Sequence, residues 1–151
     1  MNIKTDRLTI RPIIQEDIYD YYAIFSDPRV CEFDDFEPET RNTVEDTMMR
    51  MGAHTGEQEY AIIMDYGEKP VIGVLYVDSR EERRKIGIHL NQAYTGRGFA
   101  TETVRGMVNQ GVTVKYEARI EYENENSREL FKRCGFSLQR VEGNEAVYWY
   151  R

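Results

Sequence analysis

The chain has 151 residues, of which 40% are hydrophobic and 31% charged, and its formal net charge is −7. This length suits a single domain over residues 1–151, and the negative charge disfavours a nucleic-acid binder, which usually carries a basic patch. Two cysteines, Cys31 and Cys134, make no disulfide framework. The N-terminus lacks a signal-peptide pattern and no apolar run is long enough to span a membrane, so we expect a cytoplasmic protein without nucleic-acid or membrane partners.

The N-terminal third is predicted to hold a strand, a helix, an acidic segment and a second helix. Residues 4–12 alternate like a strand, with Pro12 at its end or edge. Apolar residues recur at helical spacing over 14–25, and Asp27-Pro28 ends that helix. Residues 31–46 are rich in Asp and Glu, and residues 43–52 form the second helix, ended by Gly52.

The rest of the chain has the period of strands, interrupted by two helices. Strands are predicted over 60–65, 71–78 and 83–90, and their short connections indicate an antiparallel meander. A helix follows, with apolar residues from Ala100 to Val108, and leads to a strand over 115–122 that runs parallel to 83–90. Ser127 begins the last helix, Gly135 ends it, and strands over 136–142 and 146–151 close the chain.

Two glycines mark the junction between the strand 83–90 and the helix after it, in the run Tyr94-Thr95-Gly96-Arg97-Gly98-Phe99-Ala100-Thr101-Glu102. A helix start offers unpaired N–H groups and a positive dipole end, and glycines let an anion approach the backbone. The junction is therefore a candidate phosphate site. A P-loop would need Gly-Lys-Ser/Thr, and a dinucleotide-binding turn would need a third glycine where Thr101 stands.

The residues Thr95 to Ala100 resemble the pyrophosphate-binding motif of the GNAT superfamily of acetyltransferases, Gln/Arg-x-x-Gly-x-Gly/Ala, with Thr95 departing at the first position. Downstream, the run from Asn124 to Ser127 and the pair Gly135-Phe136 resemble the Asn-x-x-Ser helix of the same family. The Ala-Thr-Glu after the glycines and the opening Thr5-Asp6-Arg7-Leu8 resemble its Rim-type branch, which acetylates N-termini of ribosomal proteins.

This resemblance implies the α/β GNAT fold, a mixed and mostly antiparallel sheet of about seven strands with four helices. It implies N-acetylation by direct attack of an amine on acetyl-coenzyme A, without a metal, and it is compatible with a homodimer. The acceptor would be a protein N-terminus, a polyamine or an aminoglycoside. In the family the region of residues 31–46 shapes the amine site, so those residues are either an acceptor wall that favours cations or a solvated loop. The expected coenzyme-binding residues are Leu90, Gly96, Arg97, Gly98, Phe99, Ala100, Thr101, Asn124 and Phe131.

The expected catalytic residues are Ser127, Asn124 and His89. Family members often carry a tyrosine where this chain has Phe131, so Ser127 becomes the candidate near the leaving sulfur, although it also suits a helix N-cap. Family members often carry a glutamate where this chain has Lys85. His89 is then either a weak base or a pocket-wall residue, with Asp78, Glu117 and Glu121 as further candidates.

The missing carboxylate has two consequences for function. It favours an α-amino acceptor, whose pKa of about 7.7–8.0 leaves a tenth or more neutral at pH 7, over an ε-amino acceptor with a pKa of about 10.4. It also keeps open a different class of function, a coenzyme A-binding module without catalytic activity. Turnover of acetyl-coenzyme A distinguishes that module from an enzyme.

Overall fold

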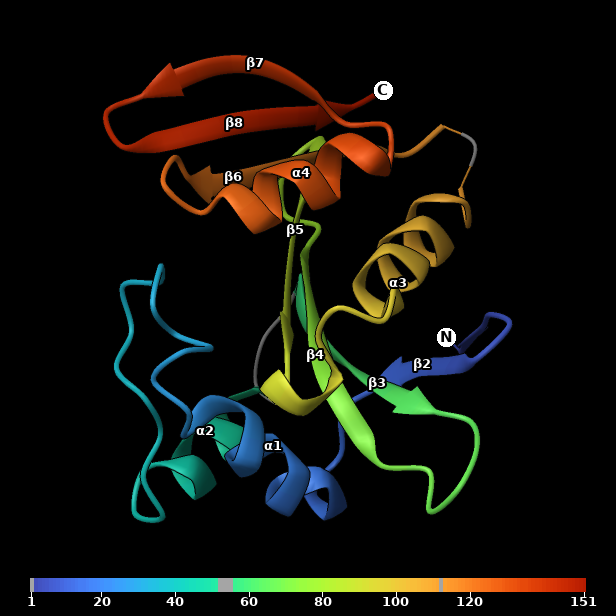
Figure 1. Cartoon of the computed structure of the whole chain (residues 1–151), viewed down its shortest axis with the longest axis vertical. Helices are drawn as coiled ribbons and strands as arrows, with labels where there is room; N and C mark the ends of the chain where they lie inside the picture. The colour runs from blue at the N-terminus through green and yellow to red at the C-terminus, as the bar shows by residue number, and fades with distance from the viewer. Residues whose placement is uncertain (1, 52–55, 112) are drawn as a thin grey trace.

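In the computed structural model, which describes residues 2–51, 56–111 and 113–151, one mixed sheet organises the chain (Figure 1). Its strand order is β1-β2-β3-β4-β5-β6-β8-β7. The strands are β1 (Ile3–Lys4), β2 (Leu8–Pro12), β3 (Glu57–Met64), β4 (Val71–Asp78), β5 (Arg83–Leu90), β6 (Lys115–Glu121), β7 (Ser137–Glu142) and β8 (Glu145–Tyr150). All neighbours pair antiparallel except β5 and β6. The predicted mixed, mostly antiparallel sheet is confirmed, with eight strands among the described residues rather than about seven.

The extra strand arises because the predicted strand over 4–12 is wrong as one element. The chain turns between Lys4 and Leu8, and β1 folds back on β2 with Ile3 opposite Ile10. Thr5 Oγ1 accepts the Leu8 amide at 3.1 Å, which closes the turn locally. Polar and apolar residues continue to alternate with a two-residue period through this turn, so the pattern over 4–12 does not reveal it.

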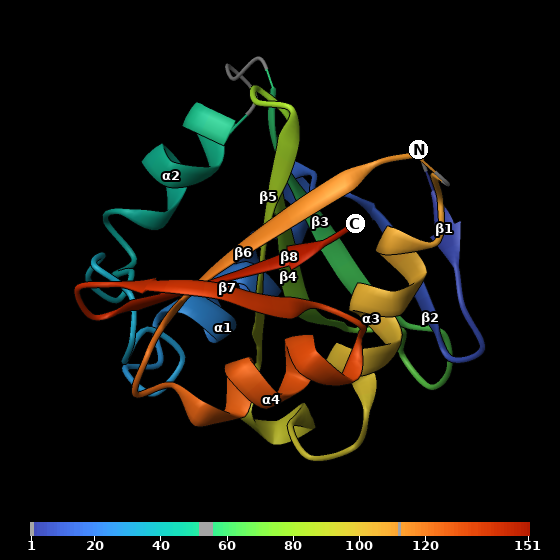
Figure 2. The same ribbon diagram turned by 90° about the horizontal axis from the view of Figure 1, so that it is seen from above.

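Two pairs of helices cover opposite faces of the sheet (Figure 2). The helices α1 (Ile18–Phe25) and α2 (Val44–Met51) pack on β3 and β4 around a core that contains Phe25, Ala61 and Val74. The helices α3 (Phe99–Val108) and α4 (Glu125–Arg133) cover the other face, over the larger core. The four predicted helices are confirmed within the part of the chain that the structure describes. Short 3-10 turns, η1 (Gln15–Asp17) and η2 (Gln92–Tyr94), precede α1 and α3.

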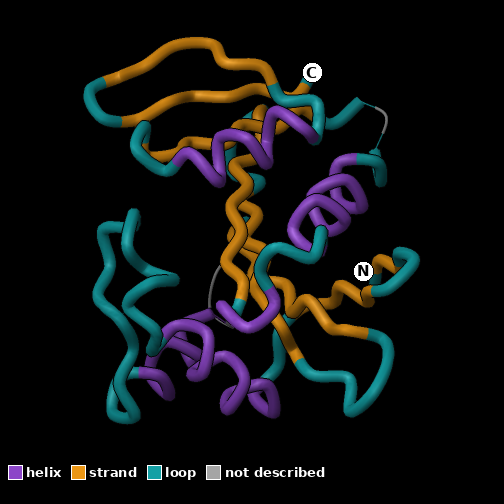
Figure 3. The backbone as a smooth tube through the Cα atoms, viewed as in Figure 1, coloured by secondary structure: helices purple, strands orange, loops and turns teal. Residues whose placement is uncertain are grey.

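The strands predicted over 71–78 and 83–90 have the observed boundaries, and the boundaries of the other elements differ by up to four residues. The largest difference is at α1, which begins at Ile18 rather than at residue 14 because residues 15–17 form the 3-10 turn η1, and β3 begins at Glu57 rather than at residue 60. The predicted helix end at Gly52 lies outside the described residues. A long loop, residues 26–43, joins α1 to α2 and runs beside the sheet (Figure 3).

The parallel strands β5 and β6 pair over only three residues. Arg83, Arg84 and Lys85 lie opposite Lys115, Tyr116 and Glu117, and no register continues beyond them. From Ile86 to Leu90 the strand β5 therefore stays paired with β4 alone. This divergence opens the centre of the sheet toward α3 and α4.

Candidate active site

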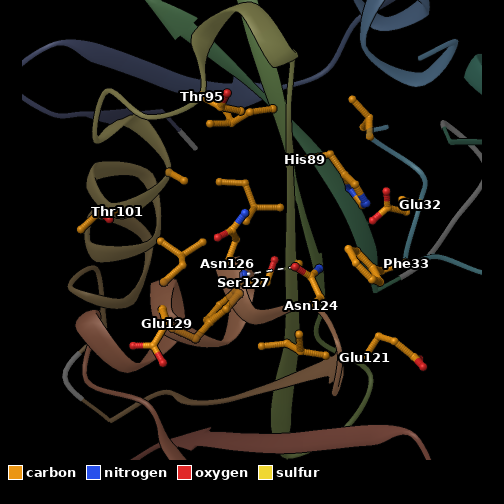
Figure 4. Close-up of a pocket in the computed structure, with 18 of the residues that line it drawn as sticks. Glu32, Phe33, His89, Thr95, Thr101, Glu121, Asn124, Asn126, Ser127 and Glu129 are labelled. Carbon is orange, nitrogen blue, oxygen red and sulfur yellow. Dashed lines mark hydrogen bonds between the residues drawn. The ribbon is translucent and has the colours of Figure 1, made fainter. Parts of the chain in front are cut away.

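The divergence of β5 and β6 forms one wall of a cavity of about 840 Å³. Its other walls come from the glycine turn at 95–98, the first residues of α3, and α4. Figure 4 shows Thr95 and Thr101 on the side of the turn and α3, His89 and Phe33 opposite them, and Ser127 and Asn124 between. Segments more than 90 residues apart in the chain thus line one cleft.

The glycine turn has the backbone conformation that an anion site requires. Gly96 and Gly98 have φ of 75° and 82°, and Gly98 is the N-cap of α3. The first backbone hydrogen bond of α3 runs from the Glu102 amide to Gly98 O, at 3.1 Å. The amides before it in the first turn lack intrahelical acceptors, so their N–H groups and the helix dipole favour a phosphate at this end of the cleft.

A network that sequence reasoning missed holds this turn from behind. Glu102 on α3 accepts hydrogen bonds from the Arg7 amide at 2.8 Å and from Arg7 Nε at 2.7 Å, and also from the Thr5 hydroxyl. Burial opposes its charge, but the hydrogen bonds from Thr5 and Arg7 outweigh burial and lower the pKa of Glu102. Arg7 Nη1 donates to Arg97 O at 3.0 Å, so the turn between β1 and β2 positions the glycine turn.

The pairing of β5 with β4 determines which β5 amides face the cleft. Asn91, just past β5, donates its amide to Ile72 O of β4 at 2.8 Å. Because N–H directions alternate along a strand, the amides of His89 and Gly87 also point to β4. Those of Leu90 and Ile88 point the other way, to the side where β6 has diverged. They are the β5 donors available to a carbonyl oxygen in the cleft.

The start of α4 contributes polar groups to the same cleft. Asn124, not Ser127 as the sequence suggests, is the N-cap: its Oδ1 accepts the Ser127 amide at 3.3 Å. The prediction that Ser127 is the cap is therefore wrong, because the helix begins at Glu125, two residues earlier than its serine. The Ser127 hydroxyl has no hydrogen-bond partner among the described residues and lines the cleft.

The remaining predicted coenzyme residues differ in how they meet the cleft. Leu90, Phe99, Ala100 and Phe131 line it. Phe131 is also buried in the core, with its ring 5.0 Å from that of Phe136, and can donate no proton. Arg97 does not line the cleft; its guanidinium lies over the rings of Tyr94 and Phe99.

A second cavity, of about 590 Å³, lies on the α1/α2 face of β5. It shares Asp34, Ile86, Gly87, His89 and Arg119 with the first cavity, so the two meet at β5. His89 Nε2 lies 2.7 Å from Asp34 Oδ2 of the 26–43 loop. Its ring packs between Phe25 and Phe36, at 5.2 and 5.7 Å, which makes it a pocket-wall residue that anchors the acidic loop.

Glu59 is a half-buried residue of this second cavity that sequence reasoning missed. It lies on β3, and its Oε2 has no hydrogen-bond partner among the described residues. Burial raises the pKa of Glu59, although a hydrogen bond from Tyr21 and the nearby His89 oppose that shift. No sequence motif marks it; the only signal is a glutamate in a strand whose next residues are apolar.

Two of the other three candidate bases, Asp78 and Glu117, are paired with arginines. Asp78 accepts Arg80 Nη2 at 2.6 Å, and hydrogen bonds from Arg80 lower the pKa of Asp78 to about 2. Glu117 accepts Arg119 Nε at 2.9 Å and the Trp149 indole at 3.0 Å. Neither belongs to the lining of the second cavity. Glu121 lines only the first cavity.

The described residues contain neither a metal-binding cluster nor a membrane-spanning helix. No group of three or more His, Cys, Asp or Glu side chains among them is placed to hold a metal ion. Within the same residues, no helix is long and apolar enough to cross a membrane.

The fold and the cleft agree with comparisons of the whole sequence. Residues 7–137 match the family model of the acetyltransferase (GNAT) domain. The chain belongs to the GNAT family of acetyltransferases. A Bacillus licheniformis protein named as an uncharacterized N-acetyltransferase, p20, is 28% identical to this GNAT chain over 145 residues, which span 89% of it and 82% of that protein.

Solved GNAT structures share the fold. An acetyltransferase of Bacillus anthracis superposes with a TM-score of 0.86 at 21% identity, over 99% of this chain and 98% of that one. Spermidine N-acetyltransferase of Vibrio cholerae, in complex with CoA and spermine, superposes with a TM-score of 0.78 at 17% identity, over 96% of this chain and 94% of that one. RimL, a ribosomal L7/L12 α-N-protein acetyltransferase in complex with CoA, superposes with a TM-score of 0.81 at 13% identity, over 99% of this chain and 97% of that one. The expected resemblance to the GNAT family and to RimL-like proteins is confirmed at the level of the fold.

Proposed function

We propose that this GNAT enzyme transfers the acetyl group of acetyl-coenzyme A to a primary amine by direct attack, within the domain formed by residues 1–151. The observation that carries the proposal is the meeting of two cavities at Gly87 and His89. One cavity has the donors that a pyrophosphate needs, and the other has carboxylates for a cationic amine. A transfer between two bound molecules requires such adjacent sites.

The coenzyme fits the first cavity on three grounds. The amides at 96–101 face a cradle in which glycines leave the backbone open, and a Cβ at Gly96 would meet no atom within 4 Å. The diverging strands leave room for the pantetheine arm, with Asn124 and Phe131 lining its path. The amides of Ile88 and Leu90 are positioned to stabilise negative charge on the thioester oxygen, a contribution of about 3–4 kcal/mol in related chemistry.

Ser127 is the proposed proton donor to the leaving sulfur. Its hydroxyl has no hydrogen-bond partner among the residues that the structure describes, and Phe131 has no proton to donate in its place. A coenzyme thiolate, with a pKa near that of a cysteine thiol of about 8.5, leaves with little assistance, so we expect Ser127→Ala to lower kcat by less than about tenfold. Asn124 acts by capping α4 and thereby positioning Ser127.

The charge of the second cavity supports a cationic acceptor. Five carboxyl groups line it, those of Asp34, Asp35, Glu37, Glu39 and Glu59, against the three cations Arg50, Lys85 and Arg119. This excess raises the local concentration of amines that carry positive charge. The likeness in fold extends both to a spermidine acetyltransferase and to an acetyltransferase of ribosomal-protein N-termini, and both acceptor classes are cationic at neutral pH.

The test is a screen for released thiol with acetyl-coenzyme A and candidate acceptors. Peptides with free N-termini, spermidine and an aminoglycoside are compared at equal concentration. Turnover with at least one of them supports the proposal. Calorimetric binding of coenzyme A without turnover on any amine would instead favour the coenzyme-binding module. Phe131 and Lys85, which stand where family members often carry a tyrosine and a glutamate, are compatible with that module.

A further inference from the structure

Among the described residues that line the second cavity, one carboxylate, that of Glu59, has a buried oxygen without a hydrogen-bond donor. Most carboxyl groups near β5 have partners: Asp34 contacts His89, and Glu39 accepts the Thr47 hydroxyl at 2.6 Å. Glu59 is different, because its Oε2 is buried and accepts no hydrogen bond within residues 2–51, 56–111 and 113–151. A buried carboxylate oxygen without a donor is unfavourable, and a ligand ammonium group would supply the donor.

The strand register places Glu59 on the same face of the sheet as the junction of the cavities. Glu59 lies opposite Tyr76 on β4, and Tyr76 lies opposite Gly87 on β5. Residues in register project to the same side, here the α1/α2 side. Two strand spacings of about 4.8 Å separate the Glu59 and Gly87 backbones by roughly 10 Å. Gly87 has no side chain, and a Cβ there would meet nothing within 4 Å, so this gap connects the carboxylate to the cleft.

The groups around Glu59 leave it as the base best placed for an acceptor. The titratable and charged groups that face it are Tyr21 from α1, Glu39 from the loop, Arg50 from α2, Glu57 from β3, Tyr76 from β4, Lys85 and His89 from β5, and Arg119 from β6. His89 is held by Asp34 and by two rings. Lys85 is a cation with Glu81 as its partner.

We propose that Glu59 is the general base that takes a proton from the acceptor ammonium group, directly or through one water. This inference rests on the proposed function. The carboxylate accepts one proton from R–NH3+ and gives it to solvent. The neutral amine then forms the new N–C bond with the acetyl carbon, and the C–S bond breaks. The Ser127 hydroxyl donates its proton to the leaving sulfur and regains one from the acylated nitrogen, so the second amine proton ends on the coenzyme thiol.

A base at Glu59 changes the expected acceptor range. The preference for α-amino groups inferred from the sequence rested on the absence of a carboxylate at position 85. An amine with a pKa of about 10.4 is neutral in roughly one molecule in 2,500 at pH 7. Burial raises the pKa of Glu59 above its usual range, which makes it a stronger base. The acceptor therefore need not be an α-amine.

The experiment compares Glu59→Gln with wild type, using Glu57→Gln as the matched control. Glu57 lies on the same strand and face but does not line the cavity. We expect Glu59→Gln to lower kcat/KM about 10²–10⁴-fold, and Glu57→Gln to stay within about threefold. Coenzyme A affinity by calorimetry should be the same in all three proteins, which shows that the first cavity is intact.

Two readouts separate a base from a group that only attracts charge. The acidic limb of the wild-type kcat/KM profile should be absent in Glu59→Gln, and the loss should be greater for spermidine than for an N-terminal peptide, since more of the peptide amine is already neutral. Glu59→Asp should recover part of the rate. An active wild type with Glu59→Gln within threefold of it would overturn this inference alone. Absence of turnover in wild type with every amine would overturn the proposed function as well.

Discussion

Glu59 is half-buried and has a buried carboxylate oxygen, Oε2, which makes the stability of the protein depend on pH at this residue. Because burial raises the folded-state pKa of Glu59 above its unfolded value, the charged form destabilises the fold. The penalty is absent below the unfolded pKa, about 4.3, and becomes complete as pH rises through the folded pKa.

We therefore predict that Glu59→Gln melts at a higher temperature than wild type, and that the difference is larger at pH 8 than at pH 4.5. A gain of about 2–4 °C at pH 8 corresponds to roughly 1 kcal/mol in a chain of this size. Thermal unfolding followed by circular dichroism at both pH values measures it. A difference that shrinks with rising pH would contradict the raised pKa.

Arg7 is the residue that joins the N-terminal turn to the glycine turn. It contacts Glu102 and also donates to Arg97 O, and one such hydrogen bond contributes about 0.5–1.5 kcal/mol. We expect Arg7→Ala to weaken coenzyme A binding about 3- to 10-fold, measured by calorimetry. Arg140→Ala, which removes an arginine of β7 paired with Glu142, is the control and should bind like wild type. Equal affinities in both variants would show that the glycine turn holds its conformation without Arg7.

At the scale of elements, the strand–turn–helix unit of β5, the glycine turn and α3 needs two left-handed residues. Gly98 has φ of 82°, and a Cβ there would lie 3.3 Å from Arg7 Nη2. An aspartate at this position would also place negative charge where phosphate is expected. Gly143, in the β7–β8 turn, has φ of 60° and open space around its Cβ position, so a substitution there introduces the same left-handed backbone strain away from the cleft.

We predict that Gly98→Asp abolishes measurable coenzyme A binding, while Gly143→Asp binds normally. Both variants should lose about 1–2 kcal/mol of stability from the left-handed backbone, less for Gly98→Asp if its carboxylate pairs with Arg7. Calorimetry and thermal unfolding measure the two effects separately. Normal affinity in a folded Gly98→Asp protein would place the phosphates elsewhere.

At the scale of the whole molecule, the coenzyme cleft brings together β5, α3 and α4 with the β1–β2 turn behind them. A ligand that binds only this folded arrangement stabilises it by mass action, by about 2.7 kcal/mol at 100 times its Kd. We expect coenzyme A at that concentration to raise the melting temperature by about 5–11 °C. The Gly98→Asp protein is the control and should show no shift. An unshifted wild type at saturating coenzyme A would contradict the assignment of the cleft.

The sequence by itself determined the features that depend on neighbours in the chain. The conformation of Gly96 and Gly98, the start of α3 and the extent of β4 and β5 follow from local sterics and from side-chain periodicity, which act over a few residues. The two family motifs identified the fold class, and they point to the glycine turn as the proposed coenzyme end of the cleft. The split of the first strand was missed because β1 and β2 share one alternation, and the turn between them is held by Glu102, 95 residues away.

Only the tertiary structure decided the acceptor side. Asp34 meets His89 across 55 residues, and Glu59 reaches the junction of the cavities only through the registers of β3, β4 and β5. The divergence of β5 from β6 selects the amides of Ile88 and Leu90 as donors. These features depend on which strands pair and at which residue the pairing stops. Pairing is set by packing of the whole sheet against two helix layers, and no local pattern of residue types records it.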